Sequence, residues 1–591
     1  MFKSTNARIR LVLYALLASA LPHAAHAADP APATLLARTG DASPAAMGGG
    51  PIDRIGPPAV SISDAVALGI FTSASQASPV QRSAIVRRLH GRDGFEAVAW
   101  SDLAAPPPAG VFVTFAYTLL AGTNEPATLG FVSVNALGDT AFYSGVSGAT
   151  PFAPGNDSIE LQATIARVGG TLRRFWQQLE PLPQVDGVFA VNGGTVPIMR
   201  DDRSVLARVT VNDRSNIALL EDPNGAYTAS DRFAGFRARP ETMSVNRRGD
   251  AAAIRDRRAL IRTPLVGPTE TVFDGEFEFE GQTVTVSLAN DVSLADDGTL
   301  AFFARGRVLG SSLAPEGIWI EGDGGIGLFV ERDDEAPGSE GGVFRVFRRT
   351  VAASRGFVFF EAWLGSPDGD LLPPGGRSGL WFVDDKREVR PLVRDGGIAP
   401  GTDGALFDDV SSDFFQEFSS PSFAVNTRGD AVIPATLRAD TSGVEQGVND
   451  AGLWAYDSLS GALVMLVRTG DAVDVAYEGE TPDVRTVASI LFEPSQGLAD
   501  NGRVGYTLEF TDGSFAAFST RIGEPLTACA ADLDTDGDVD MGDFGRFAAA
   551  FSSNVGDEAY DLGVDLDFDG DVDLGDFGLF GAQFGRSDCD D

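Results

Sequence analysis

Two nearly identical acidic stretches near the C-terminus are the clearest candidates for chemistry. DLDTDGDVDMGD runs from Asp532 to Asp543, and DLDFDGDVDLGD runs from Asp565 to Asp576. Each has aspartates at positions 1, 3, 5, 7, 9 and 12, glycine at position 6 and valine at position 8. Such a density of carboxylates repels itself unless a cation holds it together. Calcium takes about six to eight oxygen ligands from a loop with this spacing, so both stretches predict calcium sites.

The predicted ligands correspond between the two loops. Positions 1, 3 and 5 supply carboxylates, position 7 a backbone carbonyl and position 9 a ligand that is often bridged by water, and position 12 closes the shell. The ligands are Asp532, Asp534, Asp536, Asp538, Asp540 and Asp543 for one ion, and Asp565, Asp567, Asp569, Asp571, Asp573 and Asp576 for the other. The valines at position 8, Val539 and Val572, are predicted to pair with each other. Magnesium fits less well, because it prefers a rigid shell that keeps several waters.

A single helix is predicted after each loop, in DFGRFAAAF and DFGLFGAQF. Phenylalanines recur at i, i+3 and i+7, which places them on one helical face. They are Phe544, Phe547 and Phe551 in the first helix, and Phe577, Phe580 and Phe584 in the second. A core between the helices is favoured over partner contacts.

A duplicated loop followed by one helix resembles a type I dockerin, over about residues 529–591. The resemblance implies calcium-dependent binding to a cohesin-like domain or a cell-surface assembly. Loop positions 10 and 11, which read the cohesin surface in that family, are Met541-Gly542 and Leu574-Gly575. This departure leaves the kind of cohesin open. The only two cysteines, Cys529 and Cys589, flank the module. In an exported protein they predict a disulfide, worth about 4 kcal/mol in the chain-entropy model, with free thiols as the alternative.

The N-terminus has the pattern of an export signal. Lys3, Arg8 and Arg10 precede the apolar run LVLYALLASAL, and AHA ends at Ala27 with small residues at the cleavage positions. We expect a signal peptide over 1–27, and a secreted or surface-located mature chain. No later segment is apolar for long enough to span a bilayer. The net charge of −38 argues against nucleic acid and acidic membrane surfaces, because both are bound through lysine and arginine.

Two hairpin patterns recur through residues 28–525. The first has apolar stretches around N/D-x-x-G, the residue types that tight turns require; it occurs at 131–146, 242–254, 292–306, 422–437 and 497–510. The second starts with glycine, an aliphatic residue and an aromatic residue, and ends in arginine and an acid. It occurs at 317–334, 379–396 and 452–471, with a looser copy at 187–202. Together they make a four-stranded unit that repeats at the spacing of propeller blades.

The ends of this body indicate how the ring closes. The last unit lacks its closing strand, and a matching sequence, TLLARTGD, stands at 34–41. The predicted fold is therefore mainly β, a propeller of six to eight blades whose N-terminal strand completes the last blade. An open β-repeat array or a pair of sandwiches is the alternative. A small helical calcium-binding module follows at 526–591. The body is similar to secreted bacterial repeat proteins with an N-x-x-G-x-x-x-F core, best at Asn135, Gly138 and Phe142, which implies architecture only.

No catalytic residue can be nominated from the sequence. After removal of the signal, His90 is the only histidine and Lys386 the only lysine, which excludes histidine-rich zinc sites and a phosphate-binding P-loop lysine. We therefore expect a non-catalytic binding or scaffold protein. The alternative is a polysaccharide hydrolase or lyase with a carboxylate pair, since dockerins often accompany such enzymes and a pair needs no local motif. A structural surface protein is the third hypothesis. The repeated RDD, RDG and RTGD sequences favour structural turns.

Overall fold

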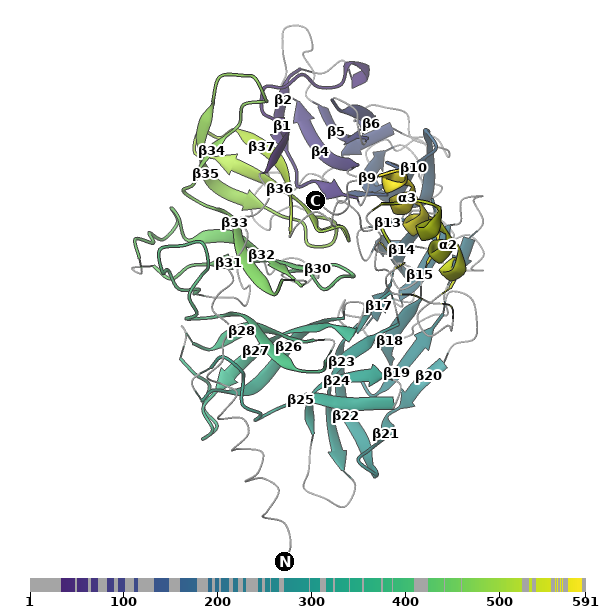
Figure 1. Cartoon of the computed structure of the whole chain (residues 1–591), viewed down its shortest axis with the longest axis vertical. Coiled ribbons are helices and arrows are strands. Elements are labelled where there is room, and N and C mark those ends of the chain that lie inside the picture. The colour runs from purple at the N-terminus through teal and green to yellow at the C-terminus, as the bar shows by residue number, and fades with distance from the viewer. Residues whose placement is uncertain are drawn as a thin grey trace, which may run out of the picture.

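The computed structural model describes residues 33–522 and 531–586 with gaps, of which the longest are 73–81, 101–110, 115–131, 148–159, 178–189, 230–242 and 409–422. The described residues form eight antiparallel sheets arranged around a ring (Figure 1). The body is therefore an eight-bladed β-propeller. Each apolar strand buries side chains against the neighbouring blade, because a sheet with two apolar faces needs a cover on both sides.

The first four blades follow one another along the chain. Blade 1 contains β2 (Ile52–Ile55), β3 (Ala59–Val60), β4 (Val66–Thr72), β5 (Arg82–Arg88) and β6 (Glu96–Trp100); blade 2 contains β7 (Val111–Thr114), β8 (Val132–Val134), β9 (Thr140–Ser147), β10 (Glu160–Val168) and β11 (Thr171–Gln177); blade 3 contains β12 (Ala190–Gly193), β13 (Ile198–Met199), β14 (Val205–Val211), β15 (Asn216–Glu221) and β16 (Tyr227–Ala229); blade 4 contains β17 (Met243–Val245), β18 (Ala251–Arg255), β19 (Ala259–Thr263) and β20 (Glu270–Asp274).

The other four blades complete the ring. Blade 5 contains β21 (Glu276–Phe279), β22 (Gln282–Leu294), β23 (Leu300–Val308), β24 (Glu316–Gly322) and β25 (Gly325–Glu331); blade 6 contains β26 (Val343–Ala352), β27 (Val358–Gly365), β28 (Ser378–Val383) and β29 (Val389–Arg394); blade 7 contains β30 (Ala424–Val425), β31 (Ala431–Thr436), β32 (Ala451–Asp457) and β33 (Ala462–Arg468); blade 8 contains β34 (Ala472–Asp474), β35 (Val484–Leu491), β36 (Arg503–Phe510), β37 (Phe515–Arg521) and the N-terminal β1 (Thr34–Arg38).

The predicted closure of the ring is confirmed. β1 pairs antiparallel with β37, with Thr34 opposite Ser519 and Arg38 opposite Ala516. A single-turn 3-10 helix, η1 (Ala45–Met47), then leads to β2 in blade 1. Blade 8 is thus built from both ends of the body, and β1 covers the edge of β37.

The looser hairpin predicted at 187–202 is wrong in detail, because β12 and β13 both pair with β14 and not with each other.

The repeated glycine–aliphatic–tryptophan sequence has a packing cause. Trp319, Trp381 and Trp454 are fully buried in blades 5, 6 and 7. Glycine stands two residues before each tryptophan, on the same face of the strand. A Cβ on Gly379 would lie 2.6 Å from Trp381, and one on Gly452 would lie 2.6 Å from Trp454. The absence of a side chain at these positions makes room for the indole rings.

The tail contains the two predicted helices, α2 (Met541–Ala550) and α3 (Leu574–Gln583), drawn in yellow in Figure 1. Phe547 and Phe580 are buried between them, with ring centroids 5.3 Å apart. The outer phenylalanines are more exposed: Phe551 at 43%, Phe577 at 44% and Phe584 at 49%. The phenylalanine face therefore supplies both a core and an exposed apolar surface. Neither helix in the described part of the chain is long and apolar enough to cross a membrane.

Candidate functional site

The first acidic loop brings three carboxylates together. Oxygens of Asp538, Asp540 and Asp543 lie within 4.8 Å of one another, the one such group in the described part of the chain. Asp543 is fully buried, and its two oxygens accept hydrogen bonds from the backbone N–H groups of Leu533, at 2.5 Å, and Asp540, at 2.7 Å. Asp540 caps α2 and accepts from the N–H of Gly542 at 2.6 Å. These bonds fix the carboxylates of Asp540 and Asp543, and the Asp538 carboxylate lies beside them.

The second loop repeats this geometry where the structure describes it. Asp576 is fully buried and accepts from the N–H groups of Leu566, at 2.6 Å, and Asp573, at 2.7 Å. Asp573 caps α3 and accepts from the N–H of Gly575 at 2.6 Å. The shared sequence pattern therefore produces the same local fold twice.

Backbone hydrogen bonds cross between the two halves of the tail. Val539 receives one from the N–H of Gly585 and donates one to the carbonyl of Arg586, both at 2.8 Å, beyond the end of α3. Val572 is bonded in the same way to Ser552 and Ser553, beyond the end of α2. The predicted pairing of Val539 with Val572 is therefore wrong. Each loop is joined to the segment that follows the other helix, because packing of the two phenylalanine faces brings those segments together.

Several predicted site residues lie outside the described residues. They are Asp534, Asp536, Asp565, Asp567, Asp569, Asp571, Cys529 and Cys589, together with the signal sequence 1–27. Asp532 is described, next to the buried Leu533. Asp538, predicted as a backbone ligand, also places a carboxylate oxygen in the cluster.

The described donor set fits calcium. Two oxygens bound to one calcium ion at 2.3–2.6 Å can be at most about 5 Å apart, and the three carboxylates meet that limit. All the donors are hard oxygens, and each oxygen that accepts a backbone N–H keeps a second lone pair. Asp538, Asp540 and Asp543 would hold the ion, which would neutralise much of their charge.

The asparagine that begins each N-x-x-G-D turn in the body has a structural role. The side-chain oxygens of Asn135 and Asn426 accept from the backbone N–H four residues later, at 2.8 and 2.9 Å. Their Nδ2 groups donate to carbonyls of the next blade, from Asn135 to Arg200 at 2.8 Å and from Asn426 to Ala499 at 3.2 Å. Asn246 makes the same two bonds, at 2.9 Å to Asp250 and at 3.1 Å to Ala295.

The aspartate that ends this motif holds the second hairpin of its own blade. Asp139 accepts from the N–H of Gly169 at 2.9 Å, and Asp430 from that of Ser458 at 3.0 Å. The aspartate of the motif therefore connects the two hairpins of one blade, and the asparagine connects that blade to the next.

The R-x-G-D sequences form a second set of joints between blades. The carboxylates of Asp41 and Asp471 each accept the N–H of the arginine three residues earlier at 2.8 Å. In the same turns, Gly40 and Asp41 pair with the backbone of Ile52, and Gly470 and Asp471 pair with that of Val487. Burial raises the pKa of the Asp471 carboxyl, against the opposing effect of the Arg468 N–H. For the two RTGD sequences, these contacts confirm the prediction of structural turns.

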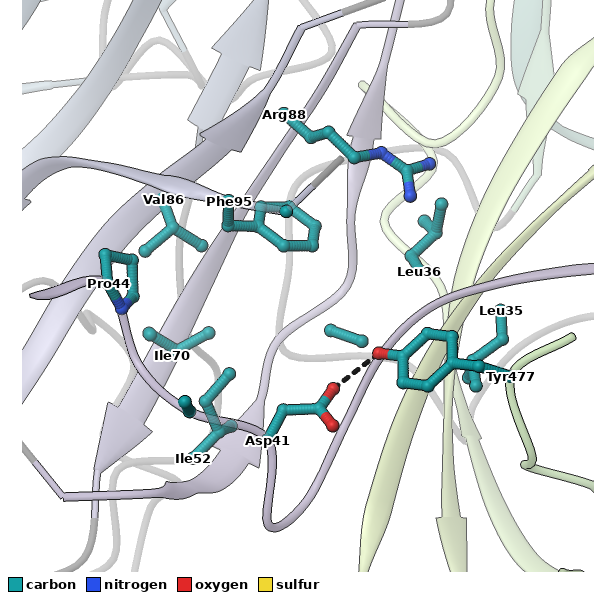
Figure 2. Close-up of a pocket in the computed structure, with 13 residues that line it drawn as sticks. Leu35, Leu36, Asp41, Pro44, Ile52, Ile70, Val86, Arg88, Phe95 and Tyr477 are labelled. Carbon is teal, nitrogen blue, oxygen red and sulfur yellow. Dashed lines mark hydrogen bonds between the residues drawn. The ribbon is translucent and has the colours of Figure 1, made fainter. Parts of the chain in front are cut away.

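A cavity of about 400 Å³ lies at the seam where blade 8 meets blade 1 (Figure 2). It lies between β1, with its following turn, and the strands of blade 1. Tyr477, from the loop between β34 and β35, faces it from blade 8. The Tyr477 hydroxyl donates to Asp41 at 2.5 Å, and Arg38 lies over its ring at 4.8 Å. Burial, together with this bond to Asp41, raises the pKa of Tyr477.

The sequence did not predict this cavity. Its lining comes from residues 35–95 and from Tyr477, which lies 436 residues along the chain from its partner Asp41 and belongs to no repeated motif. The one signal was the displaced TLLARTGD strand, which indicated the seam but not a hollow beside it.

Comparisons with known proteins add a family and a set of propellers. Residues 259–529, a little under half of the chain, match a family of unknown function (DUF7453). A search of curated proteins finds no match. The β-propeller domain of the Trilobed protease from Pyrococcus furiosus is 12% identical with a TM-score of 0.30, covering 70% of this chain and 97% of that one.

Two further solved structures are comparable. The BP39L lectin from Burkholderia pseudomallei is 10% identical with a TM-score of 0.29, covering 68% of this chain and 95% of that one. The α-L-arabinofuranosidase Arb93A from Fusarium graminearum is 10% identical with a TM-score of 0.23, covering 83% and 99%. Such low similarity gives no basis for transferring an activity. The chain is thus an eight-bladed propeller that matches a family of unknown function over residues 259–529.

Proposed function

We propose that this chain is a secreted, non-catalytic binding or scaffold protein, attached to a partner through a C-terminal module that folds around two calcium ions. The observation that carries the proposal is the cluster of Asp538, Asp540 and Asp543, whose hydrogen bonds recur at Asp573 and Asp576. A group of carboxylates whose oxygens converge within 4.8 Å offers the hard oxygen ligands that calcium prefers. The export signal at 1–27 would bring the module to a calcium-rich environment.

The attachment surface is assigned to the exposed residues at loop position 10. Met541 is 67% exposed and Leu574 is 74% exposed, and both stand at the start of their helices. The repeated hydrogen bonds make the two positions equivalent. Large apolar side chains exposed in pairs favour an apolar contact with another protein, and the surrounding carboxylates favour basic residues around it. A cohesin-like domain of this character is the proposed partner.

A non-catalytic body is supported by the roles of its repeated acids. Asp41, Asp139, Asp430 and Asp471 are engaged in turns that join strands and blades. A glycosidase requires two carboxylates that face a substrate, whereas these four accept hydrogen bonds from the backbone of the turns and strands around them.

Calcium binding is tested on the full-length protein by isothermal titration. Two calcium ions per chain are expected, with loss of helical circular dichroism on adding EDTA. Asp538→Asn should weaken one of the two sites, whereas Asp368→Asn, at an exposed position of the body, should not. Binding of no calcium would refute the metal assignment.

The role of the body is tested separately on a panel of polysaccharides, by scoring binding and the release of reducing ends. Binding without turnover is expected. Sustained turnover that one Asp or Glu substitution in the body abolishes would establish the hydrolase or lyase alternative. The predicted disulfide is tested by alkylation: neither Cys529 nor Cys589 should react before reduction.

A further inference from the structure

Two arginines of blade 6 lie against the same aromatic ring. Arg348 in β26 and Arg377, directly before β28, place their guanidinium carbons 4.5 and 4.6 Å from the centre of the Trp363 ring in β27. Each contact is a cation–π interaction, which holds the guanidinium near the ring without neutralising its charge. One indole therefore positions two cations.

These two guanidiniums have no acidic partner. Arg390, in β29 of the same blade, pairs with Asp384 at 2.8 Å. Within the described part of the chain, no salt bridge or side-chain hydrogen bond engages the guanidinium of Arg348 or of Arg377. Glu361, opposite Arg348 in the sheet, is buried and does not pair with it. In a chain with a net charge of −38, two neighbouring cations without a carboxylate at salt-bridge distance are an exception that calls for an anion.

The pair lies at an open end of the side of blade 6 that faces blade 7. Phe359 packs in the core shared with blade 7, and Trp363 stands four residues further along β27, on the same face of the strand. Val346 is opposite Trp363 in the sheet and is 38% exposed. Because directly opposed residues have their side chains on the same face, solvent reaches this face beside the ring. A ligand can therefore approach the two arginines.

The arrangement favours an anion with two charges and several oxygens. Both guanidinium carbons lie within 4.6 Å of one ring centre, so they are within about 10 Å of each other, the screening length at 0.1 M salt, and they repel. A phosphate monoester carries about two negative charges above pH 7 and has three strong acceptor oxygens, enough for two guanidiniums. A carboxylate has one charge and two oxygens, which a single guanidinium already occupies in a bidentate pair.

We propose that Arg348 and Arg377 together bind the phosphate group of a small ligand. The net charge of the chain selects against a long polyanion, which would meet the acidic surface beyond the pair. A single phosphate group is influenced mainly by the two nearby guanidiniums, because more distant charges are screened. The exposed Val346 offers an apolar contact to an organic body attached to the phosphate. This site is separate from the calcium loops and does not depend on the attachment proposed above.

The test compares ligands on the full-length protein by calorimetry at pH 8 and 0.1 M sodium chloride. Phenyl phosphate should bind at one site, about tenfold more tightly than benzoate, which has the same ring and one carboxylate. Inorganic phosphate separates the sources: equal affinity would identify the free ion as sufficient, and tighter binding of phenyl phosphate would identify an organic ester. Equal affinities for phenyl phosphate and benzoate, tighter binding of dextran sulfate, or no binding at all would overturn the proposal.

Variants locate the binding. Arg348→Gln and Arg377→Gln should each weaken phenyl phosphate by about tenfold. Arg348→Lys keeps the charge but not the planar fork, and should lose less. Arg307→Gln, at an exposed position on blade 5, removes the same charge elsewhere and should change nothing.

Urea unfolding followed by tryptophan fluorescence checks that each variant is folded. If Arg348→Gln does not fold, Arg348→Lys and Arg377→Gln still carry the test. Unchanged binding in the variants of both arginines would place the phosphate elsewhere and refute the proposal. An equal loss in Arg307→Gln would refute it as well, because the response would then follow net charge and not the pair.

Discussion

The hydroxyl of Tyr477 donates a hydrogen bond to the carboxylate of Asp41 at 2.5 Å, across a separation of 436 residues. Next to it, Arg38 donates to Glu480 at 2.7 Å and to the carbonyl of Val475 at 2.6 Å. All of these bonds join the end of β1 to the loop between β34 and β35. The strand that closes the ring is therefore held by its pairing with β37 and by these side-chain bonds of Arg38 and Asp41 to the β34–β35 loop.

Loss of the hydrogen bond between Tyr477 and Asp41 should destabilise the body. Tyr477→Phe removes the hydrogen bond to Asp41 and keeps the ring over which Arg38 lies, at an expected cost of about 1–2 kcal/mol. Urea unfolding followed by tryptophan fluorescence measures this cost. Tyr506→Phe is the control: burial alone raises the pKa of Tyr506, and its stacking on Phe518 survives the substitution. An equal loss of unfolding free energy in both variants would mean that removing a buried tyrosine hydroxyl, and not the bond to Asp41, causes the effect.

The asparagine of the repeated turns should contribute to the stability of the body both within its own turn and through its bond to the next blade. Asn426→Ala removes an acceptor for the Asp430 N–H and a donor to Ala499 of the next blade, and should cost about 2 kcal/mol. Asn426→Asp keeps the acceptor and should lose less. Asn449→Ala, in an exposed turn, is the comparison and should cost well under half as much. The free energy of unfolding in urea decides between them, and equal costs at the two sites would contradict the joint between blades.

Glycine-to-alanine substitutions should have opposite signs at two positions. A Cβ at Gly452 would meet the Trp454 ring at 2.6 Å, so Gly452→Ala should destabilise the body by about 1–3 kcal/mol. Gly545, inside α2, has open space around its Cα and no positive φ, so Gly545→Ala should stabilise that helix by about 1 kcal/mol. Urea unfolding reports the first change and thermal circular dichroism of the helices the second. Destabilisation by both would show that space at Cβ is not the deciding factor.

The stability of the body should depend on the protonation of Glu493. Burial raises the pKa of this carboxyl above its ordinary value of 4.5, partly opposed by bonds from Ser495. The folded chain therefore binds the proton more tightly than the unfolded chain, and this contribution is lost as pH rises through the folded pKa. Glu493→Gln should make unfolding less favourable at pH 7.5 and should be nearly neutral at pH 3.5. Glu335→Gln, at an exposed position, is the control, and a benefit of Glu493→Gln that persists unchanged at pH 3.5 would refute the assignment.

The propeller could be predicted from the sequence where its repeats are regular. The units at 292–334 and 422–471 carry both hairpins and form blades 5 and 7, and the second hairpin at 379–396 forms part of blade 6. The stretch from 72 to 185 lacks this regularity, yet it completes blade 1 and forms blade 2. There β7 and β8 both pair with β9, which interrupts the simple order of strands. A periodic pattern cannot reveal a blade whose strands are interrupted in this way.

The sequence by itself determined the local structures: the hairpin turns, the glycine before each buried tryptophan, the two acidic loops and the helices that follow them. These depend on residues close together in the chain, where backbone geometry and residue type suffice. Only the tertiary structure decided which residues far apart come together. Ring closure brought Tyr477 to Asp41 and formed a cavity beside β1. Helix packing paired Val539 with the segment after α3 and not with Val572. Such contacts depend on how whole elements pack, which no short stretch of sequence records.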